Sequence, residues 1–390
     1  MREWLTRGEA LAKLRVRPQT LYAYVSRGLV GRASDPADPR RSLYRAEDVE
    51  ALHRRRTRGR GAAAIATGAI AWGEPVIDTA LSTVAQGRLV YRGHDAAALA
   101  QAATLEEVAA LLWDASPPLP VAGRVEGGPI DDTGARGSAH PRPLPQAGEG
   151  FSALAALASE SISTIGRPRA RLVADAVQAV ATLAAAMGAR GEGPIHMRLA
   201  RGWGLASGGE DLVRRALVLL ADHELNPSTF ATRVSAATGA SLAASLLAGL
   251  AALSGPRHGG AGRATAALAA EAERDGAEAA VGRWLASGHA LPGFGHPLYP
   301  YGDPRAVALL AGVTVDADLA NVAEAVAAAT EALPNIDFAL LAATRAAGWP
   351  TDAPFRLFAV ARSVGWAAHA MEQAASGAAI RPRARYVGMT

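Results

Sequence analysis

The sequence predicts a mainly α-helical protein, and three observations support that fold class. Alanine, leucine, glycine and arginine dominate, and aromatic residues make up only 5% of the 390 residues. Such sequence, poor in β-branched residues, favours close-packed helices. Beyond residue 150, glycine or proline separates successive helical patterns up to residue 376, and no long β pattern occurs. The length suffices for a large buried core and suggests two or three domains.

Residues 1–58 predict a small module of their own. Thr6 and Glu9 form a capping box that opens a helix ending near Leu14. Pro18 suits the first turn of a second helix, which runs to Val25. The rest of the module predicts a loop over 35–41, a short extended piece over 42–44 and a charged helix over 46–56. Residues 59–69 then predict a linker.

The remaining sequence, residues 70–388, predicts one larger body. Residues 87–94 alternate like a strand and end in a turn, and residues 95–115 carry the apolar spacing of a single amphipathic helix. The stretch 116–150 is rich in proline and glycine, so we predict a flexible loop without regular structure there.

Two absences limit the chemistry. The chain contains no cysteine, which excludes thiolate nucleophiles, disulfides and cysteine metal sites. Its single lysine is Lys13, so the body cannot form a lysine Schiff base or a lysine-containing phosphate loop. Any catalysis by the body must therefore use His, Asp, Glu, Arg, Ser, Thr or Tyr side chains.

Charge and hydropathy differ along the chain. Residues 1–60 carry a net charge of +8 and residues 61–390 a net charge of −4, so the basic character belongs to the module. The start lacks an apolar signal segment. The weakly polar run Ala240–Ser254 is too short for a comfortable membrane span and predicts a buried helix. We expect a cytoplasmic protein that does not enter a membrane.

Four short segments place polar residues among glycines and prolines between helices. Each histidine alone is typical of a surface or structural residue, but glycine beside histidine lets the backbone approach a ligand closely. Together and in this order, the four segments favour a site. They read D-H-E-L-N-P-S-T-F (222–230), G-P-R-H-G-G (255–260), G-F-G-H-P-L-Y followed by D-P-R (293–305), and N-I-D-F (335–338).

With Y-R-G-H (91–94), A-R-S-V-G-W (361–366) and R-P-R (381–383), these motifs resemble the citrate synthase family. The resemblance implies a large and a small helical domain closing over a cleft, the small one at about 255–350 and inserted in the large one. It also implies an acyltransferase that condenses acetyl-CoA or propionyl-CoA with oxaloacetate and water. The products are citrate or 2-methylcitrate, and CoA. The acyl-CoA is a co-substrate, and neither a metal nor another cofactor is expected.

The resemblance also implies residue roles. Asp337 is the base that takes the α-proton of the thioester, His258 hydrogen-bonds the thioester carbonyl, and His296 polarises the ketone of oxaloacetate. Arginine's planar fork suits the two substrate carboxylates. The residues implied in substrate binding are His223, Arg305, Arg362 and Arg381. The arginine matching Arg381 comes from the neighbouring subunit in the family, which implies a homodimer with shared active sites.

Two departures from the family pattern concern CoA. Pro297 and Pro300 occupy positions where most bacterial relatives have basic residues, and Gly262-Arg263 stands where Asn-Glu is common. Each lost phosphate contact weakens CoA binding by roughly 1–3 kcal/mol. The cations available to compensate are Arg257, Arg263, Arg383 and Arg385.

Residues 1–58 resemble the winged helix-turn-helix of MerR-type regulators and excisionases, which predicts DNA binding. The second helix of such a unit enters the major groove with its first residues facing the bases. A small appendage with solvated charges is the simpler interpretation. The alternative function is a citrate-synthase-like regulator that senses a metabolite and binds DNA, with little or no catalysis. The candidate DNA contacts are Gln19, Thr20 and Tyr22 to bases and Arg15, Arg17, Arg40 and Arg41 to phosphates.

Overall fold

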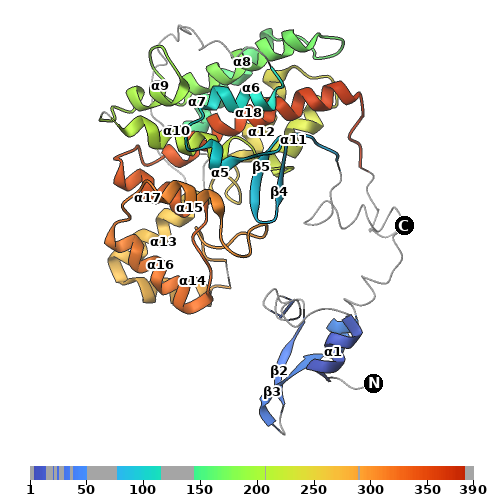
Figure 1. Cartoon of the computed structure of the whole chain (residues 1–390), viewed down its shortest axis with the longest axis vertical. Helices are drawn as coiled ribbons and strands as arrows, with labels where there is room; N and C mark the ends of the chain where they lie inside the picture. Colours follow the sequence, from blue (N-terminus) through green and yellow to red (C-terminus); the bar gives the residue numbers. More distant parts are fainter. Residues whose placement is uncertain are drawn as a thin grey trace, which may run out of the picture. The chain divides into compact units, whose positions relative to one another are not determined.

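The computed structural model describes residues 4–14, 21, 24–25, 30–35, 38–50, 77–115, 145–206, 208–288 and 290–382. The chain divides into two compact units, Met1–Asp78 and Thr79–Thr390 (Figure 1).

The first unit combines a helix with a three-stranded antiparallel sheet. Helix α1 (Arg7–Leu14) begins as predicted, because Glu9 Oε2 accepts from Thr6 N at 2.7 Å and Thr6 Oγ1 accepts from Glu9 N at 3.3 Å. Side chains of Leu14 and Tyr44 are buried in its small core. The sheet has the order β1-β3-β2, with strands β1 (Trp4–Thr6), β3 (Asp38–Arg45) and β2 (Arg32–Asp35).

The predicted loop over 35–41 is wrong, because residues 38–41 belong to β3. A proline argued against a strand there. However, β1 pairs only with Leu43–Arg45, so among the described residues no strand pairs with Pro39 on that side and its missing N–H is tolerated. The predicted helix over 46–56 is present over 46–50, and 51–56 lie outside the described residues. Of the predicted second helix, only residues 21 and 24–25 are described, and they are helical.

The second unit opens with a small antiparallel sheet, β4-β5-β6. The predicted strand over 87–94 is found as β5 (Arg88–Tyr91) and the start of β6 (His94–Asp95), and β5 pairs with β4 (Ser82–Ala85).

The single helix predicted over 95–115 is wrong, since two helices occupy it, α5 (Ala96–Leu99) and α6 (Leu105–Leu112). Asp95 caps the first, and a capping box between Thr104 and Glu107 starts the second.

The stretch predicted as a loop over 116–150 ends earlier than expected. Helix α7 (Pro145–Glu160) includes its last six residues, so the loop prediction is wrong for 145–150. Proline is well suited to the first position of a helix, and Leu154 then enters the core. Residues 116–144 lie outside the described residues.

The larger of two cores in this unit surrounds α18 (Ala353–Ser376), which ends at the predicted residue. Most residues of α18 are buried, and the helix lies among α6, α8 and α12 in Figure 1. Among the described residues, no helix is long and apolar enough to span a membrane. The other helices around this core are α8 (Arg169–Ala186), α9 (Ile195–Gly202), α10 (Gly209–Leu220), α11 (Pro227–Ala236) and α12 (Leu242–Leu253).

The second core contains Leu268, Val281 and Val322. Its helices are α13 (Ala261–Asp275), α14 (Ala277–Ala286), α16 (Ala317–Thr330) and α17 (Ile336–Ala346), with α15 (Pro304–Leu310) beside α17 (Figure 1). This core lies within the range predicted for a small domain, and the domain boundaries themselves stay a prediction.

Helix α17 belongs to both cores. Ile336 and Leu340 pack in the larger core, whereas Phe338 and Leu341 pack in the second one. Residues three and four positions apart share one face of a helix, so α17 presents a separate apolar face to each core. Asp337, in the first turn of α17, therefore lies at the junction of the two cores.

Candidate active site

His258 lies in a tight turn that only glycine permits. His258 N donates to Gly255 O at 3.0 Å, and Gly259 N to Leu253 O at 2.9 Å. A Cβ atom on Gly259 would lie 2.6 Å from Leu253 O, so a side chain there cannot fit without moving backbone. On the ring, Nε2 lies 2.8 Å from Ser228 Oγ, whose hydroxyl donates to Asn226 Oδ1 at 2.7 Å. The contact to Ser228 occupies Nε2 of His258, so Nδ1 is the ring nitrogen available to a ligand.

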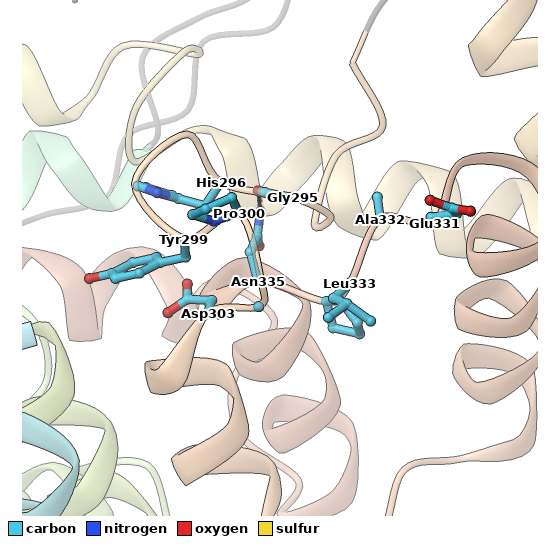
Figure 2. A pocket seen from close by; sticks show the side chains of 11 residues that line it. Gly295, His296, Tyr299, Pro300, Asp303, Glu331, Ala332, Leu333 and Asn335 are labelled. Carbon is cyan, nitrogen blue, oxygen red and sulfur yellow. Dashed lines mark hydrogen bonds between the residues drawn. The ribbon is translucent and has the colours of Figure 1, made fainter. Parts of the chain in front are cut away.

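His296 and Asp337 are brought together by two loops that bond to each other. Gly295 N donates to Leu333 O at 2.8 Å, and Asn335 Nδ2 donates to Gly295 O at 3.0 Å. Asn335 also caps α17, because its Oδ1 accepts from Asp337 N at 2.9 Å. Figure 2 shows His296 and Asn335 on these adjoining loops. The same asparagine thus fixes the loop that carries His296 and the helix that carries Asp337.

The tautomer of His296 follows from its backbone contact. Leu298 N donates to His296 Nδ1 at 3.2 Å, so Nδ1 is an acceptor and the ring hydrogen of the neutral form is on Nε2. Burial and the nearby Arg305 lower the pKa of His296 to about 4, against a smaller opposing effect of Asp303. At neutral pH, His296 is therefore a neutral donor.

A cluster of rings surrounds His223. His223 Nε2 lies 2.8 Å from Tyr299 Oη, and its ring meets His296 edge-on with centroids 5.2 Å apart. Tyr299 also packs against His296, with centroids 4.9 Å apart, and under the Arg305 guanidinium at 5.2 Å. His223, His296 and Arg305 therefore converge on one tyrosine.

Two buried arginines flank the cluster. Arg305 is 3% exposed and forms a bidentate ion pair with Asp303, in which Nε donates to Oδ1 at 2.9 Å and Nη2 donates to Oδ2 at 2.7 Å. Arg362 is 2% exposed and donates Nε to Leu220 O at 2.9 Å. Arg305 was predicted to offer its fork to a ligand. The structure places Asp303 on one edge of that fork, which leaves Nη1 without a contact to Asp303.

Burial and the nearby arginines shift the pKa values of His223 and His258. Burial lowers the pKa of His223 well below its ordinary value, and Arg305, Arg362, His296 and His258 lower it further. Burial, and then Arg362, lowers the pKa of His258 to about 4. All three histidines are thus neutral at physiological pH. Both arginines act on His223, whereas Arg362 acts on His258 and Arg305 on His296.

The pKa of Asp337 is shifted upward, opposite to the pKa values of the histidines. Burial raises its pKa to about 6, with Asp303 adding to the rise and Arg305 opposing it. A carboxylate with a pKa near neutrality is well suited to take and return a proton. Perturbed carboxylates beside neutral histidines are typical of acid–base sites.

The neutral histidines predict an acid-sensitive fold. Each has a folded-state pKa below its unfolded value of about 6.5, so this contribution to stability is complete above that pH and is lost as pH falls toward 4. We expect the free energy of unfolding to decrease between pH 7 and pH 5. Urea unfolding at both pH values measures it, and the decrease should be smaller in a His258→Gln variant. An equal decrease in parent and variant would contradict this reasoning.

The structure does not connect the remaining predicted residues to this cluster. Arg381 is exposed beyond the end of α18, and no contact among the described residues connects it to the histidines. Arg40 and Arg41 lie on β3, and only their backbone is described. The other candidate DNA contacts, Arg15, Arg17, Gln19, Thr20 and Tyr22, lie outside the described residues, as do Arg383 and Arg385.

Sequence reasoning missed a buried polar chain behind His223. His369 Nδ1 accepts from Arg233 Nε at 2.8 Å, and its Nε2 faces Asp222 Oδ2 at 3.1 Å. Ser82 Oγ also donates to Asp222 Oδ2 at 2.5 Å. Asp222 directly precedes His223, so this chain anchors the loop that carries it. The available signal was that His369 follows Arg362 by two helical turns, which places both on one face.

The second unit is thus a helical protein with two cores. Buried arginines, neutral histidines and a carboxylate of raised pKa gather in it. The family model described as citrate synthase, C-terminal domain, matches residues 70–383. The chain belongs to the citrate synthase family.

Sequence relatives also support membership of this family. Citrate synthase 2 of Bacillus subtilis is 35% identical over 185 residues, which are 45% of this chain and 50% of the relative. 2-methylcitrate synthase of Shewanella oneidensis is 33% identical over 187 residues, with 45% and 50% covered. The chain spans about half the length of the curated relatives it matches.

Solved structures show the same fold. Citrate synthase from Thermotoga maritima superposes with a TM-score of 0.63 at 23% identity, covering 81% of this chain and 94% of that one. Citrate synthase from Thermoplasma acidophilum, in a ternary complex with carboxymethyl coenzyme A and oxaloacetate, gives 0.64 at 22% identity with the same coverage. At these identities the likeness extends to the fold alone.

Proposed function

We propose that this protein condenses an acyl-CoA with oxaloacetate, in the simplest case acetyl-CoA to give citrate. One observation carries the proposal: Asp337, with its raised pKa, lies at the junction of the two cores, in a unit that also holds neutral His296, neutral His258 and two buried arginines. The relatives named citrate synthase and 2-methylcitrate synthase, and the neighbour bound to a CoA analogue and oxaloacetate, support it.

The first step needs a base and a stabilised enolate. The Asp337 carboxylate takes a proton from the methyl carbon of the thioester, and the carbonyl oxygen gains negative charge. His258 stabilises that oxygen through Nδ1. This requires the Ser228 hydroxyl to turn from Asn226 to His258 Nε2, which places the ring hydrogen on Nδ1. Asn226 Oδ1 would still accept from Ser228 N and Thr229 N, both at 3.1 Å.

The second step forms the carbon–carbon bond. The enolate carbon attacks the ketone carbon of oxaloacetate, and the ketone oxygen takes a proton from His296 Nε2–H. The proton taken by Asp337 then replaces the one lost by His296, so both groups return to their starting states. Arg305 Nη1 and Arg362 bind the substrate carboxylates beside His223, and Arg381 of a neighbouring subunit adds a third cation. Water then cleaves the thioester, so acetyl-CoA, oxaloacetate and water yield citrate and the CoA thiol.

Release of free thiol tests this function. We expect purified full-length protein to release thiol from acetyl-CoA or propionyl-CoA only when oxaloacetate is present. Which acyl chain is preferred depends on pocket shape, because one methylene changes the activation free energy by only about 1–3 kcal/mol. Failure to release thiol from both donors would refute the proposal.

The hydroxyl of Tyr299 gives a more local prediction. In a Tyr299→Phe variant, His223 Nε2 loses its 2.8 Å partner inside a buried site. Leaving a buried polar group unpaired costs about 1–3 kcal/mol, so kcat/KM for oxaloacetate should fall roughly tenfold or more. Tyr301→Phe is the control, since Tyr301 is 93% exposed and should tolerate the change. Equal kinetics of the two variants would show that the bond does not contribute.

We also propose that the protein acts as a homodimer, which would supply the partner's Arg381. Ile162 and Ile165, between α7 and α8, are 64% and 77% exposed, and Val234 on α11 is 37% exposed. A Cβ on Gly239, just after α11, would lie 2.5 Å from Ile165 Cδ1, so the exposed Ile165 side chain lies against the segment that follows α11. Exposed apolar groups of this kind favour an interface. Light scattering should give twice the chain mass, and a monomer would contradict the proposal.

The second candidate function is DNA-binding regulation by the first unit. The separate fold of residues 1–78, its antiparallel β2–β3 pair and the net charge of +8 over residues 1–60 favour it. In a gel-shift assay, the full chain should bind DNA and a chain lacking residues 1–60 should not. Binding should weaken as salt rises, because released counterions drive it. DNA binding by the shortened chain would show that residues 1–60 are not needed for it and would contradict this candidate function.

A further inference from the structure

Helix α18 lies directly against the end of α10, just before His223. Arg362 Nε donates to Leu220 O at 2.9 Å, and one turn further along α18, Gly365 N donates to Ala221 O at 3.1 Å. A Cβ atom on Gly365 would lie 2.5 Å from that same oxygen, so the two backbones approach this closely only with glycine at 365. The start of the loop that carries His223 is therefore fixed on α18.

The next residue of the loop, Asp222, is bonded to the same helix through its side chain. His369 follows Gly365 by four residues, which places both on one face of α18. His369 Nδ1 accepts from Arg233 Nε at 2.8 Å, so Nδ1 carries no hydrogen and the ring hydrogen is on Nε2. Nε2 therefore donates to Asp222 Oδ2 at 3.1 Å. Both residues are 0% exposed, so water does not compete for this bond.

Strand β4 holds the same loop at two points. Ser82 Oγ donates to Asp222 Oδ2 at 2.5 Å and accepts from Glu224 N at 3.0 Å. The Glu224 carboxylate in turn accepts from Val84 N at 2.5 Å. The two residues that flank His223 in the chain are thus both bonded to β4.

The backbone of this loop is strained beside His223. Glu224 has a φ of +51°, in the left-handed region that residues with a side chain rarely adopt. Such strain persists only where surrounding contacts fix the backbone, and it is typical of functional sites. The His223 side chain, between its two bonded neighbours, is directed to Tyr299, with Nε2 2.8 Å from Tyr299 Oη. The contacts of residues 222 and 224 therefore determine where His223 lies in the site.

Helix α18 thus carries Arg362 and, through His369 and Asp222, also determines the position of His223. We infer that Asp222 and His369 are positioning residues for oxaloacetate, which hold His223 where it binds the same substrate molecule as Arg362. Neither residue touches the substrate, and both act through the loop. The inference rests on the proposed function, in which His223 and Arg362 bind oxaloacetate. A displaced His223 lowers affinity because hydrogen bonds weaken steeply with distance and angle.

Two substitutions of His369 test this role. Glutamine offers an oxygen that accepts from Arg233 Nε and an N–H that donates to Asp222, whereas leucine, of similar size, offers neither. A hydrogen bond to a charged group contributes roughly tenfold in affinity, so the KM for oxaloacetate should rise about tenfold in His369→Leu and stay within about twofold of the parent in His369→Gln. The KM for acetyl-CoA at saturating oxaloacetate should not change. An equal rise of both KM values, or no rescue by glutamine, would overturn the inference.

A substitution on β4 reaches the same carboxylate from a different element. Ser82→Ala removes the second donor to Asp222 and the acceptor of Glu224 N, and should also raise the KM for oxaloacetate several-fold. Ser363→Ala is the control, because Ser363 is buried on α18 but bonds only Val360 O of its own helix, at 2.6 Å. It should leave both KM values unchanged. An equal effect of the two variants would overturn the inference, since any buried change would then produce it.

Calorimetry separates this inference from the proposed function. Binding of oxaloacetate to the full chain, without any acyl-CoA, measures the same effect without turnover. A dissociation constant about tenfold higher in His369→Leu than in the parent, and restored in His369→Gln, supports the inference even if no thiol is released, an outcome that would refute only the proposed function. Equal dissociation constants in the parent and His369→Leu, or no binding of oxaloacetate by the parent, would overturn the inference.

Discussion

Replacing Asp337 with asparagine should lower kcat for thiol release about a thousandfold, because the proposed base is lost. The amide has nearly the same shape, and Asp337 N still donates to Asn335 Oδ1, so α17 should keep its cap. The parent rate should also depend on pH. With a pKa of about 6, Asp337 is protonated below that value, so kcat should rise with pH and reach half its maximum near pH 6.

The same substitution should make the protein no less stable. A carboxyl whose pKa is raised in the folded state adds stability below its unfolded pKa and loses it as pH rises through the folded pKa of about 6. At pH 7.5 the ionised Asp337 therefore destabilises the fold, by up to about 3 kcal/mol for a shift of about two pKa units. The Asp337→Asn variant should unfold at an equal or higher urea concentration than the parent.

A control variant tests whether the effects on kcat and stability are specific to Asp337. Asp318→Asn makes the same change in the first turn of α16, at an exposed position, and should leave kcat and stability unchanged. A loss of activity in Asp337→Asn accompanied by a loss of stability would indicate a structural role instead. Retained activity would exclude Asp337 as the base.

The residues most readily predicted from sequence are those whose local context is unusual. His258 precedes Gly259, where a Cβ would meet backbone, and His296 follows Gly295, whose φ is positive. Asp337 comes two residues after the asparagine that caps its helix. These signals lie within a few residues of each side chain. The mainly helical fold was predictable for the same reason, since helices such as α18 are patterns of neighbouring residues.

What escaped prediction depends on partners distant in the sequence. Nothing near Asp222 indicates that it meets His369, 147 residues later. The Thr104–Glu107 capping box indicated that a new helix begins after α5. The continuous apolar pattern over 95–115 nevertheless led to the prediction of one helix. In strand β3, residues 42–44 were predicted as extended, but residues 38–41 were missed because pairing with β2, not composition, stabilises the strand.

The pairing of Asp303 with Arg305 was only half predictable. Asp followed by Pro is typical of a helix N-cap, and Asp303 Oδ1 does accept from Arg305 N at 3.0 Å. Its second role could not be predicted, since Oδ2 also accepts from Ile336 N at 3.1 Å, 33 residues away. One carboxylate thus ties α15, the Arg305 guanidinium and the start of α17 together.

Removing this carboxylate should therefore be among the most damaging single changes. In an Asp303→Ala variant, Arg305 stays 97% buried without its counter-ion, since it is 3% exposed in the parent. Breaking a buried ion pair by removing one partner costs about 3–5 kcal/mol, and loss of the cap adds about 1 kcal/mol. We expect urea unfolding at pH 7.5 to show a decrease in the free energy of unfolding of that size, together with loss of thiol release.

A second variant identifies the cause. If the uncompensated charge is the main cost, Arg305→Met in the Asp303→Ala background should restore much of the stability, because an apolar side chain of similar length replaces a buried cation. Activity should stay lost, because the cation proposed to bind substrate is gone. A double variant no more stable than Asp303→Ala would instead assign the cost to the caps of α15 and to Ile336 N, which both variants leave without their acceptor.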